Sequence, residues 1–552
     1  MKKFFILLVT FIFTFALFAG CMSSLEFKET EEIVSKDNFN ATGYPIVDES
    51  ITIKVMGAKA SLQSDWSQLD VMKAMEELTN IKLVYNLVPQ DGYTERKNLA
   101  FASGDLPDLF LRAFITIPDE MAYGTQARML LPLNTLIENY APNLLSLMDE
   151  GKGNVGNIRE GLTALDGNIY SLPSIALTPT SPGGLIHIRV DFLENTGMEI
   201  PTNTDELYEV LRAFKYGDPN KSGKDDIIPM SVLGMPHGLL LSAFGDAGGG
   251  RFNVIDDKVI FSPMTVAYRE YVTYLAKLFA EGLIDNEMFS QTTQELLAKG
   301  EQRLIGVHVT GPNMYGVGGA REVLILPPLT SPINNVKMTP MDSGYSIGVA
   351  ALTIKNPYPE ATMRWIDVFY QPDVNKYENG LGGIAGWFGI EDMHYHLEEV
   401  DGEYYYERAS YRNNFPDRDK DMAMNQYIHT YVTPGGAGTW PRYLPPLMEY
   451  APILDHIITG EYNHLKGPHC KEHYFPYMTQ GYSEFIRFTE DEQQELAIIE
   501  ADLLTFMAQI DAQYVIGEKS MDSWDEVLET LKEIGVDRAL EIRQNAYDRS
   551  RN

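Results

Sequence analysis

The sequence is poor in cysteine and in positive charge. Among 552 residues there are two cysteines, and 44 lysine and arginine residues stand against 77 aspartate and glutamate residues. The resulting formal net charge of −33 repels nucleic acid and anionic lipid headgroups. We therefore expect no nucleic-acid partner and no adsorption to a membrane through basic residues.

Short motifs of catalysis are also missing. The sequence contains no Gly-x-Ser-x-Gly, no His-Glu-x-x-His, no Walker phosphate loop and no dinucleotide-binding fingerprint. We therefore expect no enzymatic activity and no organic cofactor. One class of enzyme stays open as the alternative, because a secreted glycoside hydrolase needs only two opposed carboxylates, and an acidic chain offers many.

Long apolar runs are confined to the amino terminus. Two lysines precede an apolar run over 4–18, and Ala19-Gly20-Cys21 follows. This order is typical of a bacterial lipoprotein signal. We predict a signal peptide over 1–20, lipidation of Cys21, and a protein held on the extracytoplasmic face of the cell membrane by lipid alone. An ordinary signal peptide or an uncleaved anchor helix is the alternative.

The second cysteine, Cys470, is then the only free thiol, so we expect no disulfide within the chain. Core burial must hold the fold, and this length with 44% hydrophobic residues favours two domains or lobes. The polar residues 21–49 lack periodicity and are predicted to form a flexible tether.

Histidines near Cys470 match no zinc spacing, and we assign them no metal. These histidines are His464, His469 and His473.

Hydrophobic patterns predict an α/β fold. Ile51, Ile53 and Val55 alternate as in a half-buried strand, a helical stripe follows up to Asn80, and 81–85 is a second strand. Such βαβ order implies a parallel sheet with helices packed on it. Residues 108–111 are the expected third strand.

Polar and aromatic residues flank these first strands. Ligands of parallel sheets gather beyond the carboxyl ends of the strands. We therefore predict that Asp65 and Trp66, which follow the first strand, and Ser103 and Asp105, which precede the third, lie near one mouth.

A second α/β unit begins near Ile186, where apolar and polar residues alternate as in a strand. A helix is expected from Thr204, with its apolar stripe ending at Phe214, and another strand over 304–309. Residues 346–354 are again apolar and β-prone. The carboxyl-terminal part is mainly helical, with apolar stripes over 496–510 and 524–531.

Oxygen donors recur at every second position in the loop after the Thr204 helix, which reads Asp218-x-Asn220-x-Ser222-Gly223-Lys224-x-Asp226. This pattern matches the first two thirds of an EF-hand loop. An EF-hand closes with a carboxylate at its twelfth position, which is Pro229 here. The alternative is a surface turn rich in Asp, Asn, Ser and Gly, which needs no metal.

Six segments of the chain, in the order in which they occur, resemble the large extracellular solute-binding lipoproteins of ABC importers, the family 1 branch that includes oligosaccharide- and alginate-binding proteins. The resemblance covers nearly the whole chain. It implies an α/β, two-lobe periplasmic-binding-protein-like fold in which each lobe is a sheet flanked by helices, with the ligand cleft at the hinge and a helical carboxyl-terminal part. The shared segments are 186–230, 79–81, 98–108, 166–173, 275–289 and 546–549.

The resemblance also implies chain crossings near Thr178, near Tyr345 and after Tyr370. Lobe 1 is then expected to comprise 50–178 plus 345–385, and lobe 2 to comprise 179–344 plus 386–552. The implied function is that of a monomeric binding protein that takes an oligosaccharide and delivers it to the permease subunits of an ABC transporter. A glycan adhesion or sensing protein without a permease is a further alternative.

A sugar site requires aromatic planes for stacking and polar side chains for hydrogen bonds. Trp66, Trp387 and Trp440 occur in loop-like sequence, although each is equally well explained as a buried structural aromatic. Trp365 and Trp524 lie in helical patterns and are expected in the core. The full set of predicted ligand contacts is Asp65, Trp66, Ser103, Asp105, Asp246, Tyr315, Trp387, Trp440 and Arg442.

Relatives that carry the loop motif bind calcium through the first, third, fifth and ninth side chains, the seventh carbonyl and a glutamate at the tenth position. In this chain the tenth position is Ile227, so one carboxylate ligand is absent. The resemblance therefore implies a weak structural Ca²⁺ site, with the polar turn as the alternative. Its expected ligands are Asp218, Asn220, Ser222, Lys224 and Asp226.

Overall fold

The computed structural model describes most of the chain. The described residues are 38–60, 63–149, 158–176, 185–248, 251–310, 323–341, 343–370, 396–400, 403–407, 440–444, 472–479, 481–483 and 485–551. The predicted signal peptide and Cys21 lie outside these ranges. Within them, no helix combines the length and apolar character that crossing a membrane requires.

The first sheet has six strands in the order β15-β4-β12-β3-β1-β2. The predicted βαβ unit is confirmed, because β1 runs parallel to both β2 and β3. Strand β12 runs antiparallel to β3 and to β4, and β15 runs parallel to β4. The strands are β1 (Ile51–Lys59), β2 (Ile81–Pro89), β3 (Leu109–Leu111), β4 (Leu172–Ala176), β12 (Tyr345–Leu352) and β15 (Arg442–Leu444).

Helices pack on this sheet through apolar stripes. Helix α2 (Asp70–Thr79) buries Met72 and Met75 among others and ends at Asn80, whose left-handed backbone (φ 59°) stops the helix. Helix α3 (Gln90–Ser103) places Phe101 against Phe110 of β3, with ring centroids 5.2 Å apart. The further elements are α4 (Ile117–Asp119), the π-helix η2 (Glu120–Gln126), α5 (Asn134–Tyr140), α6 (Pro142–Asp149), α7 (Ile158–Leu162), α13 (Pro359–Asp367) and the 3₁₀ helix η5 (Val368–Tyr370).

The second sheet has four strands in the order β10-β5-β9-β6. Strand β6 is parallel to β9, and β5 is antiparallel to β9. Helix α9 begins where predicted, because Asn203 accepts a hydrogen bond from the Glu206 amide and satisfies the first turn. The elements are β5 (Leu185–Arg189), β6 (Ile228–Ser231), β9 (Ile305–Thr310), β10 (Val323–Ile325), α8 (Val190–Thr196), α9 (Thr204–Tyr216), α11 (Val266–Ala280) and α12 (Thr293–Glu301).

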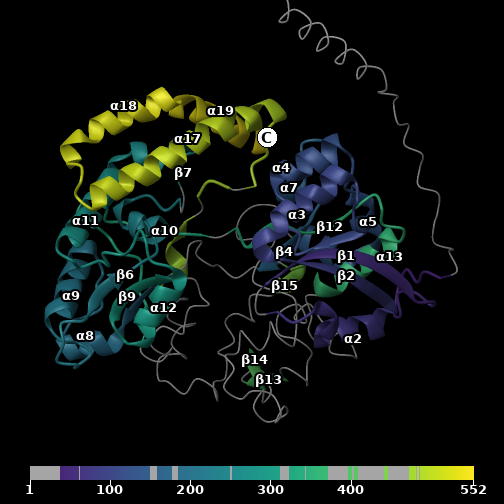
Figure 1. The fold of residues 1–552 in the computed structure, drawn as a ribbon, viewed down its shortest axis with the longest axis horizontal. Coiled ribbons are helices and arrows are strands. Elements are labelled where there is room, and N and C mark those ends of the chain that lie inside the picture. The colour runs from purple at the N-terminus through teal and green to yellow at the C-terminus, as the bar shows by residue number, and fades with distance from the viewer. Residues whose placement is uncertain are drawn as a thin grey trace, which may run out of the picture. The chain divides into compact units, whose positions relative to one another are not determined.

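The carboxyl-terminal residues 490–550 are mainly helical, as predicted, and a third helix follows the two whose apolar stripes were expected (Figure 1). The helices are α17 (Glu490–Val515), α18 (Trp524–Ile534) and α19 (Val536–Ser550), and α17 packs on α11. Thr489 and Glu492 form a reciprocal capping box at the start of α17. Leu503, Met507 and Trp524 belong to the same hydrophobic core as α9 and α11, so these helices pack with the second sheet. We call the first sheet with its helices the first unit, and the second sheet with its helices, α17–α19 included, the second unit.

One strand differs from the expected division. The sequence predicts residues 386–552 in lobe 2, but β15 pairs with β4 in the first sheet: Arg442 lies beside Ser174 and Leu444 beside Ala176. Strand pairing between such distant segments depends on tertiary packing, which no local pattern encodes. Short hairpins complete the fold, and in one of them β7 (Phe252–Ile255) pairs with β8 (Lys258–Phe261), which contacts α19.

Candidate functional site

Trp66 is fully buried and does not present a free ring face. Its indole Nε1 donates to Gln63 Oε1 at 3.2 Å, and its ring meets the edges of Tyr85 and Trp440, with centroids 5.9 and 5.6 Å away. A Cβ atom at Gly57 of β1 would lie 2.3 Å from the Trp66 ring. The indole therefore fills the space that this glycine leaves on the sheet.

Trp440 is buried as well and contacts the edge of Phe369, with ring centroids 5.5 Å apart. Its Nε1 has no hydrogen-bond partner among the described residues. Two of the three tryptophans predicted in loops, Trp66 and Trp440, thus lie together in the first unit's core, as their interpretation as structural aromatics predicts.

Asp65 remains exposed at the turn that leads into Trp66. Its carboxylate accepts from the Ser67 hydroxyl at 2.6 Å and from the Ser67 amide at 3.0 Å. These hydrogen bonds, the hydroxyl first, lower the pKa of Asp65. The side chain is therefore an exposed charged acceptor next in sequence to the buried Trp66.

Ser103 and Asp105 do not share this mouth, and the prediction that all four residues meet is wrong. Both are exposed and line a small cavity of about 290 Å³ together with Lys54. They precede β3, which pairs in parallel with β1, so they lie toward the amino ends of these strands. Asp65 follows β1 and lies beyond its carboxyl end.

Asp246 is buried in the second unit. Its Oδ1 accepts from Asn253 Nδ2 at 2.6 Å and from the Gly248 amide at 3.2 Å, while Oδ2 has no partner among the described residues. Arg442 lies in β15, and the structure describes its backbone only. Tyr315 and Trp387 fall outside the described residues.

A polar row on the second sheet was missed by the sequence reasoning. His187 of β5 and His308 of β9 are buried, stacked rings with centroids 4.9 Å apart, and Ser231 of β6 pairs beside His308. The Ser231 hydroxyl donates to Asp285 Oδ2 at 2.7 Å, and Lys299 Nζ lies 2.8 Å from the same oxygen. The strict alternation of apolar and polar residues in Ile-His-Ile-Arg over 186–189 could have predicted this row, because alternate side chains of a strand lie on the same face of its sheet.

The oxygen-rich loop between α9 and β6 folds back on itself. Asp218 accepts from the amides of Ser222 and Gly223, each at 3.0 Å. Asn220 Nδ2 and the Ser222 hydroxyl both lie within hydrogen-bond reach of Asp226 Oδ1, at 3.4 and 3.3 Å. The first, third, fifth and ninth side chains of the motif therefore converge on one small volume.

This donor set fits a hard oxygen-seeking cation in part. Carboxylate, amide and hydroxyl oxygens are the ligands that Ca²⁺ prefers. Ile227 at the tenth position is half-buried and packs against the second unit's core, so it supplies apolar contact where relatives supply a carboxylate. Among the described residues, no group of three or more His, Cys, Asp and Glu side chains forms a metal cluster. His473 is exposed, and the rest of the His464, His469 and Cys470 cluster lies outside the described part.

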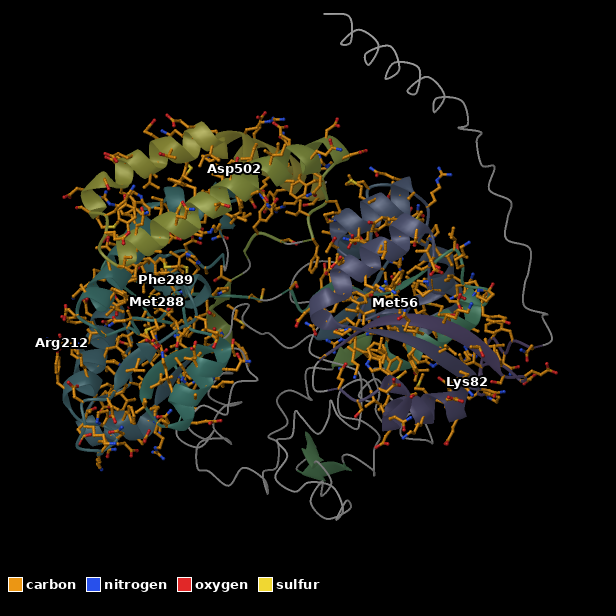
Figure 2. The ribbon with its side chains drawn as sticks, viewed as in Figure 1. Met56, Lys82, Arg212, Met288, Phe289 and Asp502 are labelled. Atoms are coloured by element: carbon orange, nitrogen blue, oxygen red, sulfur yellow. The ribbon has the colours of Figure 1, made fainter. Side chains whose placement is uncertain are left out.

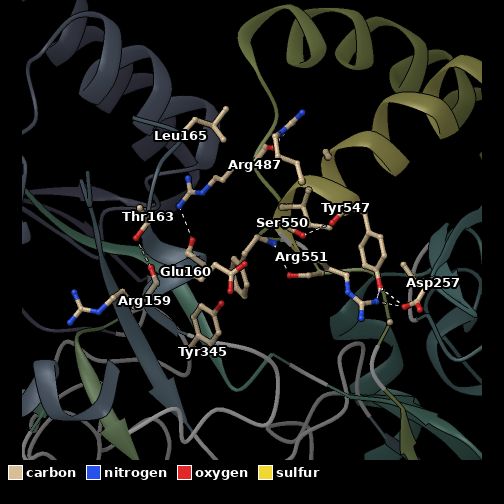
Figure 3. A pocket seen from close by; sticks show the side chains of 18 of the residues that line it. Arg159, Glu160, Thr163, Leu165, Asp257, Tyr345, Arg487, Tyr547, Ser550 and Arg551 are labelled. Carbon is tan, nitrogen blue, oxygen red and sulfur yellow. Dashed lines mark hydrogen bonds and ion pairs between the residues drawn. The ribbon is translucent and has the colours of Figure 1, made fainter. Parts of the chain in front are cut away.

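A cavity of about 1090 Å³ lies where α19 and α7 approach the segment before α17 (Figure 3). Tyr345 and Tyr547 line it together with four arginines, each held by an acidic partner. Because the guanidinium groups are already engaged, the cavity offers few donors to a ligand. The pairs are Arg159–Asp149, Arg487–Glu120, Arg549–Glu492 and Arg551–Asp257.

Residues 60–376 match the family model of the bacterial extracellular solute-binding proteins. The chain belongs to this family. Among characterised proteins it is 27% identical over 527 residues to the fructooligosaccharide ABC transporter substrate-binding protein FusA of Streptococcus pneumoniae, covering 91% of each chain. It is 30% identical over 267 residues to lipoprotein LipO of Bacillus subtilis, covering 46% of this chain and 49% of LipO.

Solved structures of this solute-binding family agree. FusA in complex with kestose superposes with a TM-score of 0.72 at 25% identity, covering 91% of this chain and 99% of FusA. An EF-hand mutant of FusA in complex with fructo-nystose matches equally well, with a TM-score of 0.72. The two-lobe α/β fold class predicted from the sequence is thereby confirmed. FusA is a substrate-binding protein of an ABC transporter, and the name of its EF-hand mutant indicates that FusA has an EF-hand.

Proposed function

We propose that this solute-binding protein takes up an oligosaccharide and delivers it, chemically unaltered, to the transmembrane subunits of an ABC importer. The observation that carries the proposal is the similarity to FusA, which extends over 91% of both chains rather than over one shared domain. The lipoprotein signal expected at Cys21, together with the similarity to LipO, supports attachment to the outer face of the membrane through lipid.

Calorimetric titration of the purified chain with a panel of oligosaccharides tests this function. Fructooligosaccharides of three to five units come first, with free fructose and an unrelated oligosaccharide as controls. We expect saturable binding of at least one oligosaccharide and no change in that sugar after prolonged incubation. Turnover at enzyme-like rates would instead favour the glycoside hydrolase, and binding of no glycan would refute the proposal.

We propose further that the Asp65 turn contributes to the sugar site, since an exposed charged acceptor is suited to pairs of sugar hydroxyls. Buried Trp66 and Trp440 then hold this turn in place from below. Asp65→Asn should lower affinity with little effect on stability, whereas Trp440→Ala should lower both. The remaining predicted contacts stay predictions, and they are Ser103, Asp105, Asp246, Tyr315, Trp387 and Arg442.

We also propose that the loop over Asp218–Asp226 binds Ca²⁺ weakly. The convergence of Asp218, Asn220, Ser222 and Asp226 supports the proposal, with the Lys224 carbonyl as a fifth oxygen donor. Because Ile227 removes one carboxylate, we expect a Kd in the range of about 10⁻⁴ to 10⁻³ M. The ion would stabilise the connection between α9 and β6 and take no part in sugar recognition.

A further inference from the structure

The segment before α17, described over 481–483 and 485–489, contacts both sheet-bearing units. Its beginning lies on the second unit: a Cβ atom at Gly481 would be 3.0 Å from Gly248 Cα, and the Tyr482 hydroxyl donates to the Arg543 carbonyl at 3.4 Å. Its middle lies on the first unit, because Phe485 stacks on Tyr345 at the start of β12, with ring centroids 4.4 Å apart. The segment is therefore shared by two cores.

Arg487 forms hydrogen bonds with both units. Its guanidinium donates to Glu120 Oε2 and, at 2.8 Å, to the Gly161 carbonyl, both in the first unit. Its own carbonyl accepts from Arg549 Nη2 of α19 at 3.2 Å. Arg549 in turn pairs with Glu492 in the first turn of α17 at 2.7 Å. A guanidinium suits this position because its donors have fixed directions, which a lysine lacks.

The acceptor of Arg487 is itself held in place. Glu120 is fully buried, and its other oxygen accepts from the Ser171 hydroxyl at 2.5 Å. The same hydroxyl accepts from the Gly348 amide at 3.1 Å. Ser171 leads into β4, and Gly348 lies in β12. We call Arg487, Glu120, Gly161, Ser171 and Gly348 the Arg487 clasp.

Three members of the clasp have unusual local structure. Glu120 opens the π-helix η2, a rare element often found at functional positions. Gly161 has no side chain where the Tyr345 hydroxyl approaches, since a Cβ atom would lie 2.0 Å from it. Gly348 has a φ of +74° at an irregularity in the pairing of β12 with β4. Burial raises the pKa of Glu120, while Arg487 and Ser171 counteract this effect.

The clasp gathers the strands from which the chain is expected to leave the first unit. Strand β4 ends just before the crossing expected near Thr178, and β12 begins at the crossing expected near Tyr345. The segment before α17 is a further connection, because α17–α19 complete the second unit's core. Hinges of two-unit binding proteins consist of a few such connections.

We propose that the Arg487 clasp is the pivot of ligand-induced closure and that Arg487 is a positioning residue for ligand binding. It fixes the connection before α17 to the ends of β4 and β12, so that the units move by rotation about one axis. This inference rests on the proposed function. Without the clasp, the free protein samples more arrangements, a smaller fraction is competent to bind, and the apparent Kd rises in proportion.

Distances between two dyes test the pivot. Lys82 of β2 and Arg212 of α9 are exposed, one in each unit (Figure 2). Both are changed to cysteine for labelling in the chain from residue 21 onward, in which Cys21→Ser and Cys470→Ser remove the natural thiols. Single-molecule energy transfer then reports the distribution of distances without ligand. The variants are Arg487→Met and Glu120→Gln, with Arg538→Met as the matched control, because Arg538 is an exposed arginine of α19 that pairs with Glu495.

We expect a broader distance distribution in both clasp variants than in the wild type and in Arg538→Met. Their Kd for the oligosaccharide should rise by about tenfold, as expected when the competent fraction falls tenfold. If Arg487→Met does not fold, the distance distribution and the Kd of the isosteric variant Glu120→Gln test the proposal. Unchanged distributions overturn the pivot, and broader distributions with unchanged affinity overturn the role in binding. If the wild type binds no sugar, the proposed function fails, while the ligand-free distances still decide on the pivot.

Discussion

At the scale of single residues, Gly348 shows how one missing side chain permits a close approach of two segments. Its φ of +74° is favourable for glycine alone, and a Cβ atom there would lie 1.8 Å from the Ile115 carbonyl oxygen. The Ile115 amide donates to the Gly348 carbonyl at 3.0 Å, so the two backbones cannot separate without losing this bond.

We predict that Gly348→Ala lowers the free energy of unfolding by at least about 2 kcal/mol, because backbone strain and steric overlap add. The control is Gly92→Ala in α3, where a Cβ atom meets nothing within 4 Å. That substitution should raise stability by about 0.5 to 1 kcal/mol. Chemical denaturation measures both, and equal effects of the two substitutions would contradict the structure.

Asp367 is the last residue of α13, and its buried carboxyl accepts hydrogen bonds from the first turn of α6. Burial raises its pKa to about 7, although the amides of Leu144 and Asn143 donate to it at 2.9 and 3.2 Å and favour the charged form. A carboxyl whose pKa is higher in the folded protein than in the unfolded chain stabilises the fold mainly when protonated. Its contribution is complete below the unfolded value of 3.8 and is lost as the pH rises towards 7.

We therefore predict that the wild type loses stability relative to Asp367→Asn as the pH rises from about 4 to about 7. Each unit of pKa difference corresponds to about 1.4 kcal/mol. Unfolding free energies of both proteins across this range give the difference. A difference that does not vary with pH would mean that the amides of α6 keep the carboxylate charged throughout.

At the scale of elements, the loop between α9 and β6 connects a helix and a strand of the same core. Asp218 and Lys221 adopt left-handed backbone conformations, with φ of 47° and 55°, and turn the donors inward. Hydrogen bonds within the loop already hold it in the described shape, so an ion would add to a preformed turn rather than create it.

We predict that millimolar calcium raises the melting temperature of the wild type and that a chelator reverses the change. At about 10 mM calcium, which is roughly a tenfold to hundredfold excess over the expected Kd, binding to the folded state alone adds about 1.4 to 2.7 kcal/mol. Asp218→Ala should abolish most of the increase, whereas Lys224→Ala should keep it, because that position supplies its carbonyl. If calcium and chelator give the wild type the same melting temperature, the loop is a polar turn.

At the scale of the whole molecule, each unit has its own sheet and its own covering helices, and α17–α19 extend the second core. A ligand that contacts both units gains its second set of contacts only on closure, which also excludes water from the hydrogen bonds. Binding and closure are therefore expected to be coupled.

We predict that saturating oligosaccharide lowers the radius of gyration measured by small-angle scattering. The clasp variant Glu120→Gln should show a larger radius without ligand and a larger decrease on binding. A sugar that does not bind in calorimetry serves as the control. An unchanged radius in the wild type at saturation would indicate a site confined to one unit.

The sequence by itself determined several helices and strands of both units, the α/β class and the family. Alternation in 51–55 and helical spacing in 207–214 are local, because a half-buried strand or helix must show its own period. The motif Asp218-x-Asn220-x-Ser222 is local for the same reason: its ligands come from one loop.

Tertiary structure alone decided which side chains are exposed and which distant segments meet. Trp66 has a loop-like sequence, but it is buried because Gly57, nine residues earlier in a different element, leaves room for its ring. The location of Ser103 and Asp105 depends on the direction of β3 relative to β1. The pairing of β15 depends on a partner strand more than 250 residues away in the sequence. Arg487 and Glu120 are 367 residues apart, and no period or spacing joins them. Contacts of this kind arise only when the cores are packed, so they are beyond any local pattern.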